Sequence, residues 1–389
     1  MRSVLWLYLF LFVAFFDLHA QYPILTPFAI SIGAAPSFIG LMMGIYSFTH
    51  LPGNIMAGYG VDRFGSRIFI VTSLMGAGVI MILQSYVTNP WQLLALRSVS
   101  GFVLAFLSPA CLALLARYAR DQVHQSKLMA GNGLIHTLAS VVSPAVGAYL
   151  VAKVGFAMAF QALGWGLVVI GALAIYMIPE PAPVAQATPA ESAAAADKSA
   201  EAALATSVPW RFYLLPLAIA CSQGILFFEL PLVGDALQSI MKTGMLFSAI
   251  SLGALLTLSL LFLNHYPAYF RTWSGAFVLS LLFFCLAIQW PVPLLVTLFM
   301  IGMTKGIILP ALSAHLLQLS GGQRYGRIFS ILSIAFSIGS FLGPVIAGQL
   351  RTVISPYFIA FLVLMSAITL LPARVPFQPQ PLKPSHRST

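Results

Sequence analysis

The chain has 389 residues, of which 60% are hydrophobic and only 7% are charged, and its formal net charge is +10. Soluble domains carry about 25% charged residues, so this composition excludes an ordinary water-soluble protein. The basic residues stand singly in short loops, which excludes a nucleic-acid-binding surface and indicates determinants of membrane topology instead.

Apolar runs of about 20 residues recur along almost the whole chain, each long enough to cross roughly 30 Å of hydrocarbon. These runs predict an all-α membrane protein with twelve transmembrane helices. Met1–Ala20 imitates a signal peptide, but the apolar pattern resumes at Tyr22, so we expect it to be retained as the first span. The predicted spans are 4–30, 37–60, 68–87, 92–117, 127–151, 156–178, 209–236, 243–264, 271–290, 292–318, 327–350 and 355–372.

The segment between the sixth and seventh predicted spans is rich in Ala and Pro and carries several acidic residues. It has too little bulky apolar content to cross a membrane or to pack. We therefore expect an N-terminal six-helix bundle over 1–178, a cytoplasmic linker over 179–208, a C-terminal six-helix bundle over 209–372 and a cytoplasmic tail over 373–389.

The two predicted bundles share landmarks at a nearly constant spacing. Pro310 follows Pro109 by 201 residues, and each of the two precedes an alanine. Pro344 follows Pro144 by 200 residues, again in the same order relative to a basic loop. Two landmarks at nearly one offset indicate an internal duplication and predict two pseudo-symmetric bundles.

Lys and Arg are distributed unevenly over the predicted loops. With the N-terminus inside, fourteen of them fall on the cytoplasmic side, and only Lys153, Lys242 and Arg351 fall outside. The remaining two, Arg97 and Lys305, lie within spans. We therefore expect a multi-pass protein of a bacterial-type cytoplasmic (inner) membrane with both termini in the cytoplasm.

The loop between the second and third predicted spans carries the most specific motif in the chain. Its sequence from Gly58 to Arg67, GYGVDRFGSR, resembles the Gly-x-x-x-Asp-Arg-x-Gly-x-Arg signature of the major facilitator superfamily. The resemblance implies two six-helix bundles that transport solutes by alternating access. Glycines permit a tight turn there, an acid can face a helix N-terminus, and arginines hold the cytoplasmic side. The residues predicted to form a gating motif are Gly58, Asp62, Arg63, Gly65 and Arg67.

Two further motifs resemble the drug:proton antiporter branch of that family. Arg97 with Gly101 is similar to an Arg-x-x-x-Gly motif whose arginine is associated with proton coupling, although Ser100 replaces the usual Gln. The fifth and eleventh spans each contain a sequence similar to the Gly-Pro-x-x-Gly signature that is linked to occlusion of the cavity, and close helix packing is the alternative interpretation. The residues predicted for packing or occlusion are Gly101, Pro144, Gly147, Gly343, Pro344 and Gly348.

Ionisable side chains within spans indicate function, because each one costs at least ~2.5 kcal/mol at the bilayer centre on insertion scales. The third, sixth and twelfth spans contain none and the ninth only Arg271 at its first position, which matches the outer supporting helices that the resemblance implies. Apart from the Lys and Arg at span ends that are counted with the loops, the ionisable residues of the other spans are Asp17, His19, His50, Arg97, His136, Glu229, Asp235, Lys305 and His315.

Depth along the helices suggests which of these groups can meet. At a rise of about 1.5 Å per residue, Asp17 and Arg97 lie at similar depths, either for proton coupling or as an ion pair for packing alone. Glu229 lies near the outer face and Lys305 markedly deeper, so that pair matches poorly unless the helices tilt. We assign Asp235 to the outer surface, and we expect His19 and His315 to serve in packing. The residues assigned to proton coupling are Asp17, Arg97 and Glu229, and those assigned to the substrate cavity are Gln21, His50, His136 and Lys305.

The leading functional hypothesis is a secondary active transporter that exports small amphipathic or drug-like solutes in exchange for protons. The alternatives are symport or uniport of a small organic anion, with Arg97 and Lys305 as cationic contacts, and a solute sensor without flux. An enzyme is disfavoured because the sequence has no Walker loop, no His-Glu-x-x-His and no Gly-x-Ser-x-Gly.

The expected partners are a small-molecule substrate, protons and the lipid bilayer, and we expect the protein to act as a monomer. No nucleic acid and no cofactor is expected. All three cysteines lie inside apolar runs, so neither a disulfide nor a metal site is expected.

Overall fold

The computed structural model describes residues 2–119, 121–178, 210–233, 239–319 and 325–371. Within these ranges all regular secondary structure is helical. The predicted linker, the predicted tail and Asp235 lie outside the described residues. The α-helices are α1 (Arg2–Ser31), α2 (Pro36–Phe64), α3 (Ser66–Gln84), α4 (Pro90–Leu104), α5 (Leu107–Tyr118), α6 (Gln122–Met177), α8 (Leu214–Glu229), α10 (Ile240–Ser259), α11 (Ala268–Ala287), α12 (Leu294–Leu319), α13 (Tyr325–Leu350) and α14 (Pro356–Thr369). Short 3-10 helices are η2 (Trp210–Tyr213), η3 (Leu230–Leu232) and η4 (Leu261–His265).

These helices account for all twelve predicted spans. In the described part of the chain, nine helical segments are long and apolar enough to cross a membrane. One of them, Lys127–Met177, covers both the fifth and the sixth predicted span. Helix α2 and the shorter apolar helix α14 correspond to the remaining two. The predicted all-α membrane fold is therefore confirmed.

The fourth predicted span is divided into α4 and α5 rather than forming one continuous helix. Pro109 lies four residues after Ala105, where it has no N–H to donate to the carbonyl of that residue. The helix is interrupted by a turn at Ala105 and Phe106, whose backbones keep right-handed helical angles. The direction of the chain is therefore preserved across the break.

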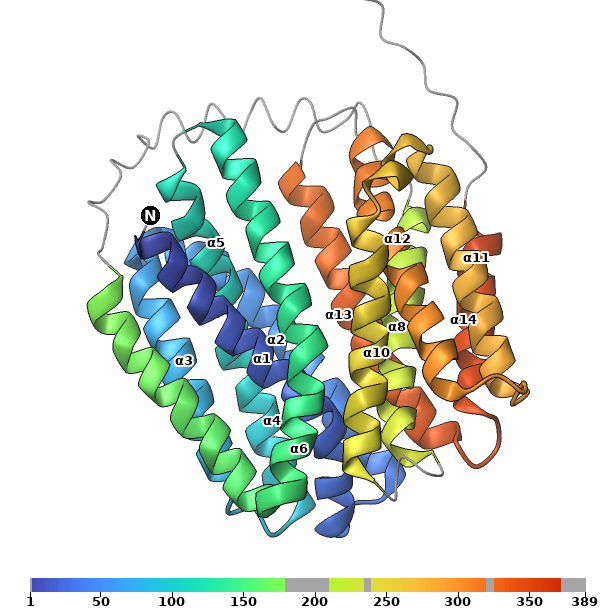
Figure 1. Cartoon of the computed structure of the whole chain (residues 1–389), viewed down its shortest axis with the longest axis horizontal. Coiled ribbons are helices and arrows are strands. Elements are labelled where there is room, and N and C mark those ends of the chain that lie inside the picture. Colours follow the sequence, from blue (N-terminus) through green and yellow to red (C-terminus); the bar gives the residue numbers. More distant parts are fainter. Residues whose placement is uncertain (1, 120, 179–209, 234–238, 320–324, 372–389) are drawn as a thin grey trace, which may run out of the picture.

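The fifth and sixth predicted spans are joined by a single residue. Gly155 has φ +80° and ψ 173°, and the residues on either side of it remain helical. A residue with a side chain rarely adopts this conformation, so glycine is what allows the chain to reverse here without a loop. Figure 1 shows the reversal, with the first part of α6 running away from the N-terminal end and the second part returning.

The helices form two groups, α1–α6 and η2–α14, which lie side by side in Figure 1. Between the groups, α6 packs on α10 and α13 packs on α2. Helix α1 begins at the end of the molecule marked N in Figure 1 and finishes at the opposite end, which we call the distal end. Contacts between the groups at Gly40 and Gly348, near the beginning of α2 and the end of α13, lie toward this distal end.

Outer helices pack through small residues. Helix α3 crosses the second part of α6 at Gly78 and Gly164, where a Cβ added to either would lie 2.7 Å from the carbonyl oxygen of the other. Lipid tails are as apolar as leucine, so close contact of this kind, and not water exclusion, holds such helices together. Gly101 of α4 meets the backbone of Tyr46 in α2, and Gly302 of α12 meets Ile250 in α10 in the same way. The two groups thus repeat one crossing, as the predicted duplication requires.

We expect Gly155→Ala to lower the free energy of unfolding by about 1–2 kcal/mol, because an alanine is strained at this positive φ. Open space surrounds the added methyl, so no clash contributes. Gly166→Ala in the same helix is the matched control, since its methyl also meets nothing within 4 Å. It should be neutral or stabilising by up to about 1 kcal/mol. Thermal unfolding of the purified proteins in detergent measures both, and equal melting temperatures would contradict the strain argument.

Candidate functional site

A cavity of about 390 Å³ lies between the two groups of helices. Its wall comes from α1 and the first part of α6 on one side and from α8, α10 and α12 on the other. Among the described residues, none from α3, α11, α14 or the second part of α6 contributes to it. These are the spans that the sequence assigned to outer support, and the volume suits a small solute.

Three aromatic rings from three helices form one wall of this cavity. Tyr22 of α1 lies with its ring centroid 4.5 Å from that of Phe227 in α8 and 6.0 Å from that of Phe247 in α10. The Phe227 and Phe247 centroids are 5.2 Å apart in an edge-to-face arrangement. These contacts join the two groups beside the cavity.

Three basic side chains line the cavity, two from α1 and α6 and one from α12. His19 of α1 and His136 of α6 lie with ring centroids 5.1 Å apart, and the Nζ atom of Lys305 in α12 lies 5.7 Å from the centroid of Phe227. The sequence assigned His136 and Lys305 to the cavity, and the structure places both in its wall. His19, which we expected to serve in packing, lines it as well.

A chain of polar contacts runs from α1 to α4 through Gln21. The amide of Gln21 donates to Oδ2 of Asp17 at 2.9 Å, and its Oε1 atom accepts from Nη1 of Arg97 at 2.6 Å. All three residues are at most 4% exposed. Oδ1 of Asp17 and Nε of Arg97 have no hydrogen-bond partner among the described residues. Asp17 and Arg97 thus come together, but through an amide that the sequence had placed in the cavity.

Arg97 has a second partner on α2. Its guanidinium carbon lies 4.6 Å from the centroid of the Tyr46 ring, which is a cation–π contact. One turn further along α2, Nδ1 of His50 bonds Nδ2 of Asn54 at 2.8 Å. His50 is not among the residues that line the cavity between the groups, although the sequence assigned it there.

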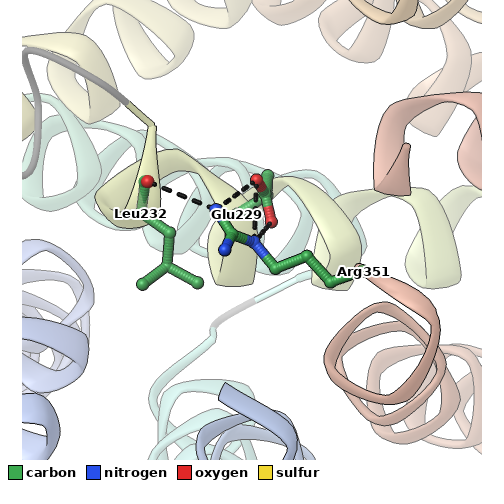
Figure 2. Close-up of polar contacts among 3 residues, drawn as sticks. All are labelled: Glu229, Leu232 and Arg351. Carbon is green, nitrogen blue, oxygen red and sulfur yellow. Dashed lines mark hydrogen bonds and ion pairs between the residues drawn. The ribbon is translucent and has the colours of Figure 1, made fainter. Parts of the chain in front are cut away.

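Arg351 forms an ion pair with Glu229, as Figure 2 shows. Nε of Arg351 lies 2.9 Å from Oε2 of Glu229, and Nη2 lies 3.1 Å from Oε1 and 3.4 Å from the carbonyl oxygen of Leu232. Sequence reasoning counted Arg351 only as an external loop charge and missed this pair. The signal was present, because span 11 ends directly before Arg351 and Glu229 was placed near the same membrane face.

The loop between α2 and α3 is reduced to Gly65, with φ 85°. Its N–H donates to the carbonyl of Val61 at 3.0 Å. The guanidinium of Arg67 donates to the carbonyl of Ile175 near the end of α6, so it holds α3 against a helix of its own group. Arg63 lies over the ring of Phe64, with a distance of 5.2 Å to the centroid. The side chain of Asp62 lies outside the described part of the structure, while Gly58 lies within α2.

The proline–glycine motifs lie where helices of different groups touch. A Cβ added at Gly244 of α10 would lie 2.6 Å from the carbonyl oxygen of Pro144 in α6, and one added at Gly40 of α2 would meet the carbonyl of Pro344 in α13. Within the groups, Gly147 meets Ala20 of α1 and Gly343 meets Cys221 of α8, whereas Gly348 meets Pro36 and Gly40 of α2 in the other group. Close packing is thus observed at each predicted motif residue of the two spans.

His315 lines neither the cavity nor the polar chain through Gln21. Its ring packs edge-on against Phe212 at 5.5 Å and Tyr269 at 5.3 Å, in an environment that leaves it 9% exposed. Cys111, Cys221 and Cys285 are free thiols. Among the described residues no group of three or more His, Cys, Asp or Glu is placed to hold a metal ion.

Comparison with known proteins agrees with this architecture. A sequence model of the Major Facilitator Superfamily matches residues 7–288 and 265–389. The multidrug resistance protein MdtG of Yersinia enterocolitica is 26% identical over 358 residues, covering 88% of this chain and 85% of that protein. MdtG of Escherichia coli is 26% identical over 360 residues, covering 89% and 86%.

Solved structures show the same fold. A bacterial homologue of the human lysosomal transporter Spinster, inward-facing and unoccupied, has a TM-score of 0.75 at 14% identity, covering 95% of this chain and 94% of that one. A mutant of the nucleoside transporter NupG has a TM-score of 0.71 at 13% identity, covering 95% and 97%.

The fold and the cavity between two helix groups define a membrane transporter. The chain belongs to the Major Facilitator Superfamily, as the loop motif predicted. It is therefore a multi-pass membrane protein that acts on a small-molecule substrate, and it is a transporter and not an enzyme.

We expect Arg351→Met to destabilise the protein more than Glu229→Gln. The side chain of Glu229 is 8% exposed and that of Arg351 is 33% exposed. Removing the arginine leaves a buried carboxylate without its partner, which costs about 1.5–3 kcal/mol, whereas glutamine keeps an acceptor and leaves no buried charge, which costs about 1 kcal/mol. Melting temperatures in detergent give the order, with the exposed Lys153→Met as a control for loss of a cation. The reverse order would show that the pair does not protect the carboxylate.

Proposed function

We propose that the protein exports small amphipathic solutes in exchange for protons, with Asp17 as the proton carrier. The observation that supports this most directly is the buried chain of Asp17, Gln21 and Arg97 next to the cavity. An ionisable group inside a membrane domain is costly and is retained where it serves transport or proton movement. The names of the MdtG relatives support export of drug-like compounds.

The neighbours of Asp17 suit a group that alternates between charged and neutral. When the carboxylate is charged, Arg97 compensates it through the amide of Gln21. When the carboxyl is protonated, the arginine still has the ring of Tyr46 beneath it. Neither state leaves the guanidinium without a partner, so the proton can come and go at moderate cost.

Helix α1 links the proton site to the substrate site. Asp17 and Gln21 face α4, while His19 and Tyr22 of the same helical turns line the cavity. A movement of α1 that follows protonation therefore displaces cavity residues as well. Because Tyr22 contacts Phe227 and Phe247 of the other group, this movement alters a contact between the groups.

The gating role of the α2–α3 loop remains part of the proposal. Arg67 fastens α3 to the end of α6, which lets the loop move with its group as one body. We infer that Asp62 and Arg63 bias the closing of the two groups at the end where α2 meets α3. Gly244, which contacts Pro144, and Gly40, which contacts Pro344, let the groups close at the distal end.

We expect Asp17→Asn to abolish uphill, proton-driven transport while downhill exchange survives, because the amide imitates the protonated acid and the rocking motion is unchanged. Glu229→Gln is the matched comparison, since it removes the other carboxylate that the structure describes within a span. The sequence assigned Glu229 to coupling as well, but because Arg351 pairs with it we expect this variant to retain coupling. Flux in proteoliposomes, with and without an imposed proton gradient, measures both. Wild-type accumulation by Asp17→Asn would rule out Asp17 as carrier, and Glu229 would then be tested as the coupling acid.

The orientation that we propose places both termini and the 179–208 linker in the cytoplasm of a bacterium, with the domains divided at 178 and 209. The excess of Lys and Arg on that side supports it. Arg63 and Arg67 belong to this side, whereas Glu229 and Arg351 belong to the outer face. The protein is proposed to act as a monomer.

A reporter fused after Ala195 should be cytoplasmic, and one placed after Asn89 should be external. Alkaline phosphatase, which is active outside the membrane, and green fluorescent protein, which is fluorescent inside, provide opposite readouts at each position. Phosphatase activity at Ala195 would reverse the orientation.

A second candidate function is symport or uniport of a small organic anion. Lys305 favours it, because this lysine lines the cavity and forms no ion pair with an acid of the described residues. The direction of the proton gradient that drives accumulation separates symport from exchange, and flux without any gradient dependence indicates uniport. Binding without flux would indicate a sensor.

A further inference from the structure

The cavity contains hydrogen-bond donors that the protein itself does not use. Among the described residues, no acceptor bonds the ammonium group of Lys305 or the ring nitrogens of His136. His136 carries at least one ring N–H in any tautomer, and a lysine carries three N–H groups and a charge. A charge without a counter-charge in an apolar setting is costly, so these groups are poised for a partner that arrives from outside the protein.

The same wall holds no acid. The described lining residues include no Asp or Glu, and Asp17 of α1, whose Oδ2 atom accepts from Gln21, is not one of them. A cation entering the cavity would meet like charge from Lys305 without a compensating carboxylate. An anion would meet the ammonium group of Lys305 and a ring N–H of His136.

Most of the remaining lining of the cavity is apolar and aromatic, and its polar members are the uncharged side chains of Thr137, Ser140, Gln223, Ser251 and Ser313. Phe247, Ile250 and Leu258 of α10 and Leu309 of α12 line it, together with Phe227 and Tyr22. A ligand that suits both parts has a negative head group and an apolar body. The distribution of basic and apolar groups within one cavity therefore restricts the substrate class more than the fold does.

One ring nitrogen of His19 already forms a hydrogen bond within the protein. Its Nδ1 atom lies 2.7 Å from the carbonyl oxygen of Phe15, and because that oxygen can only accept, Nδ1 must be the donor. A neutral His19 therefore presents an acceptor on its other nitrogen and acts on the ligand less directly than Lys305 and His136. This leaves Lys305 as the main charged contact and His136 as the second donor in the cavity wall.

We propose that the transported solutes are amphipathic anions whose acidic head group is bound by Lys305 and His136, with the apolar body against α10. This inference rests on the proposed transport function and specifies its substrate class. It differs from a role of Lys305 in packing, because a packing lysine would not discriminate among ligands by charge.

Three probes of nearly one shape test the proposal: 4-phenylbutyrate, 4-phenylbutanamide and 4-phenylbutylamine, which are an anion, a neutral amide and a cation near neutral pH. Binding to the purified full chain in an uncharged detergent is measured by isothermal titration. We expect the anion to bind about tenfold or more tightly than the amide, and the cation to bind most weakly. An amide or cation that binds as tightly as the anion, or no binding of any of the three, overturns the proposal.

Variants of Lys305 test whether this residue causes the preference for the anion. Lys305→Met, or Lys305→Gln if the first does not fold, should reduce anion affinity to that of the amide while amide affinity stays within a few-fold. Lys305→Arg keeps the charge and should retain the preference, and Lys153→Met removes an exposed lysine outside the cavity and should change nothing. Persistence of the anion preference in both charge-free variants would overturn the assignment.

Flux of the same probes in proteoliposomes separates this inference from the function on which it rests. Proton-driven flux of the amide or the amine but not of the anion would retain the transporter and reject the anionic substrate. Anion-selective binding without flux of any probe would retain the site and reject proton-coupled export.

Discussion

Helix backbones in this protein meet at glycines, and this close approach is what the rest of the structure depends on. In a bilayer, helices gain no water-exclusion energy from packing on one another, so contact at short range has to supply the association. Gly147 brings α6 against Ala20 of α1, and Gly101 brings α4 against Tyr46 of α2. These crossings set the spacing of α6 and α1 and of α4 and α2, the helices that carry the polar chain through Gln21 and the Tyr46 ring beside it. A side chain at either glycine would separate helices that the site needs together.

Much of the fold follows from the sequence because apolar length and charge asymmetry are local properties. All twelve predicted spans correspond to helices, with boundaries that mostly shift by a few residues. The break between α4 and α5 was not predicted, although Pro109 marks it, because a proline within an apolar run can bend a helix or leave it straight according to its neighbours. The position of the reversal near Gly155 was predicted, but the connection is one residue rather than the four between the predicted spans. One residue is enough only because its φ is positive.

The site was less predictable, because its contacts depend on how helices rotate about their axes. Depth placed Asp17 near Arg97, but depth alone does not reveal that Gln21 stands between them. Rotation also decides that His19 faces the cavity whereas Gln21, two residues later, faces α4. Glu229 was compared with Lys305 and judged a poor match, and its partner is instead Arg351, which a count of loop charges had treated only as a topology signal. Sequence thus supplies the residues of a membrane site more readily than their partners.

The two one-residue connections have a mechanical consequence. Gly65 joins α2 to α3, and Gly155 joins the first part of α6 to the second, so in both places a helix at the contact between the groups is tied to an outer helix without slack. Neither inner helix can shift by a turn while its outer neighbour stays still. Any rocking of the inner helices must therefore displace the surrounding lipid, and the thickness and stiffness of the bilayer become part of the energy of each transport step.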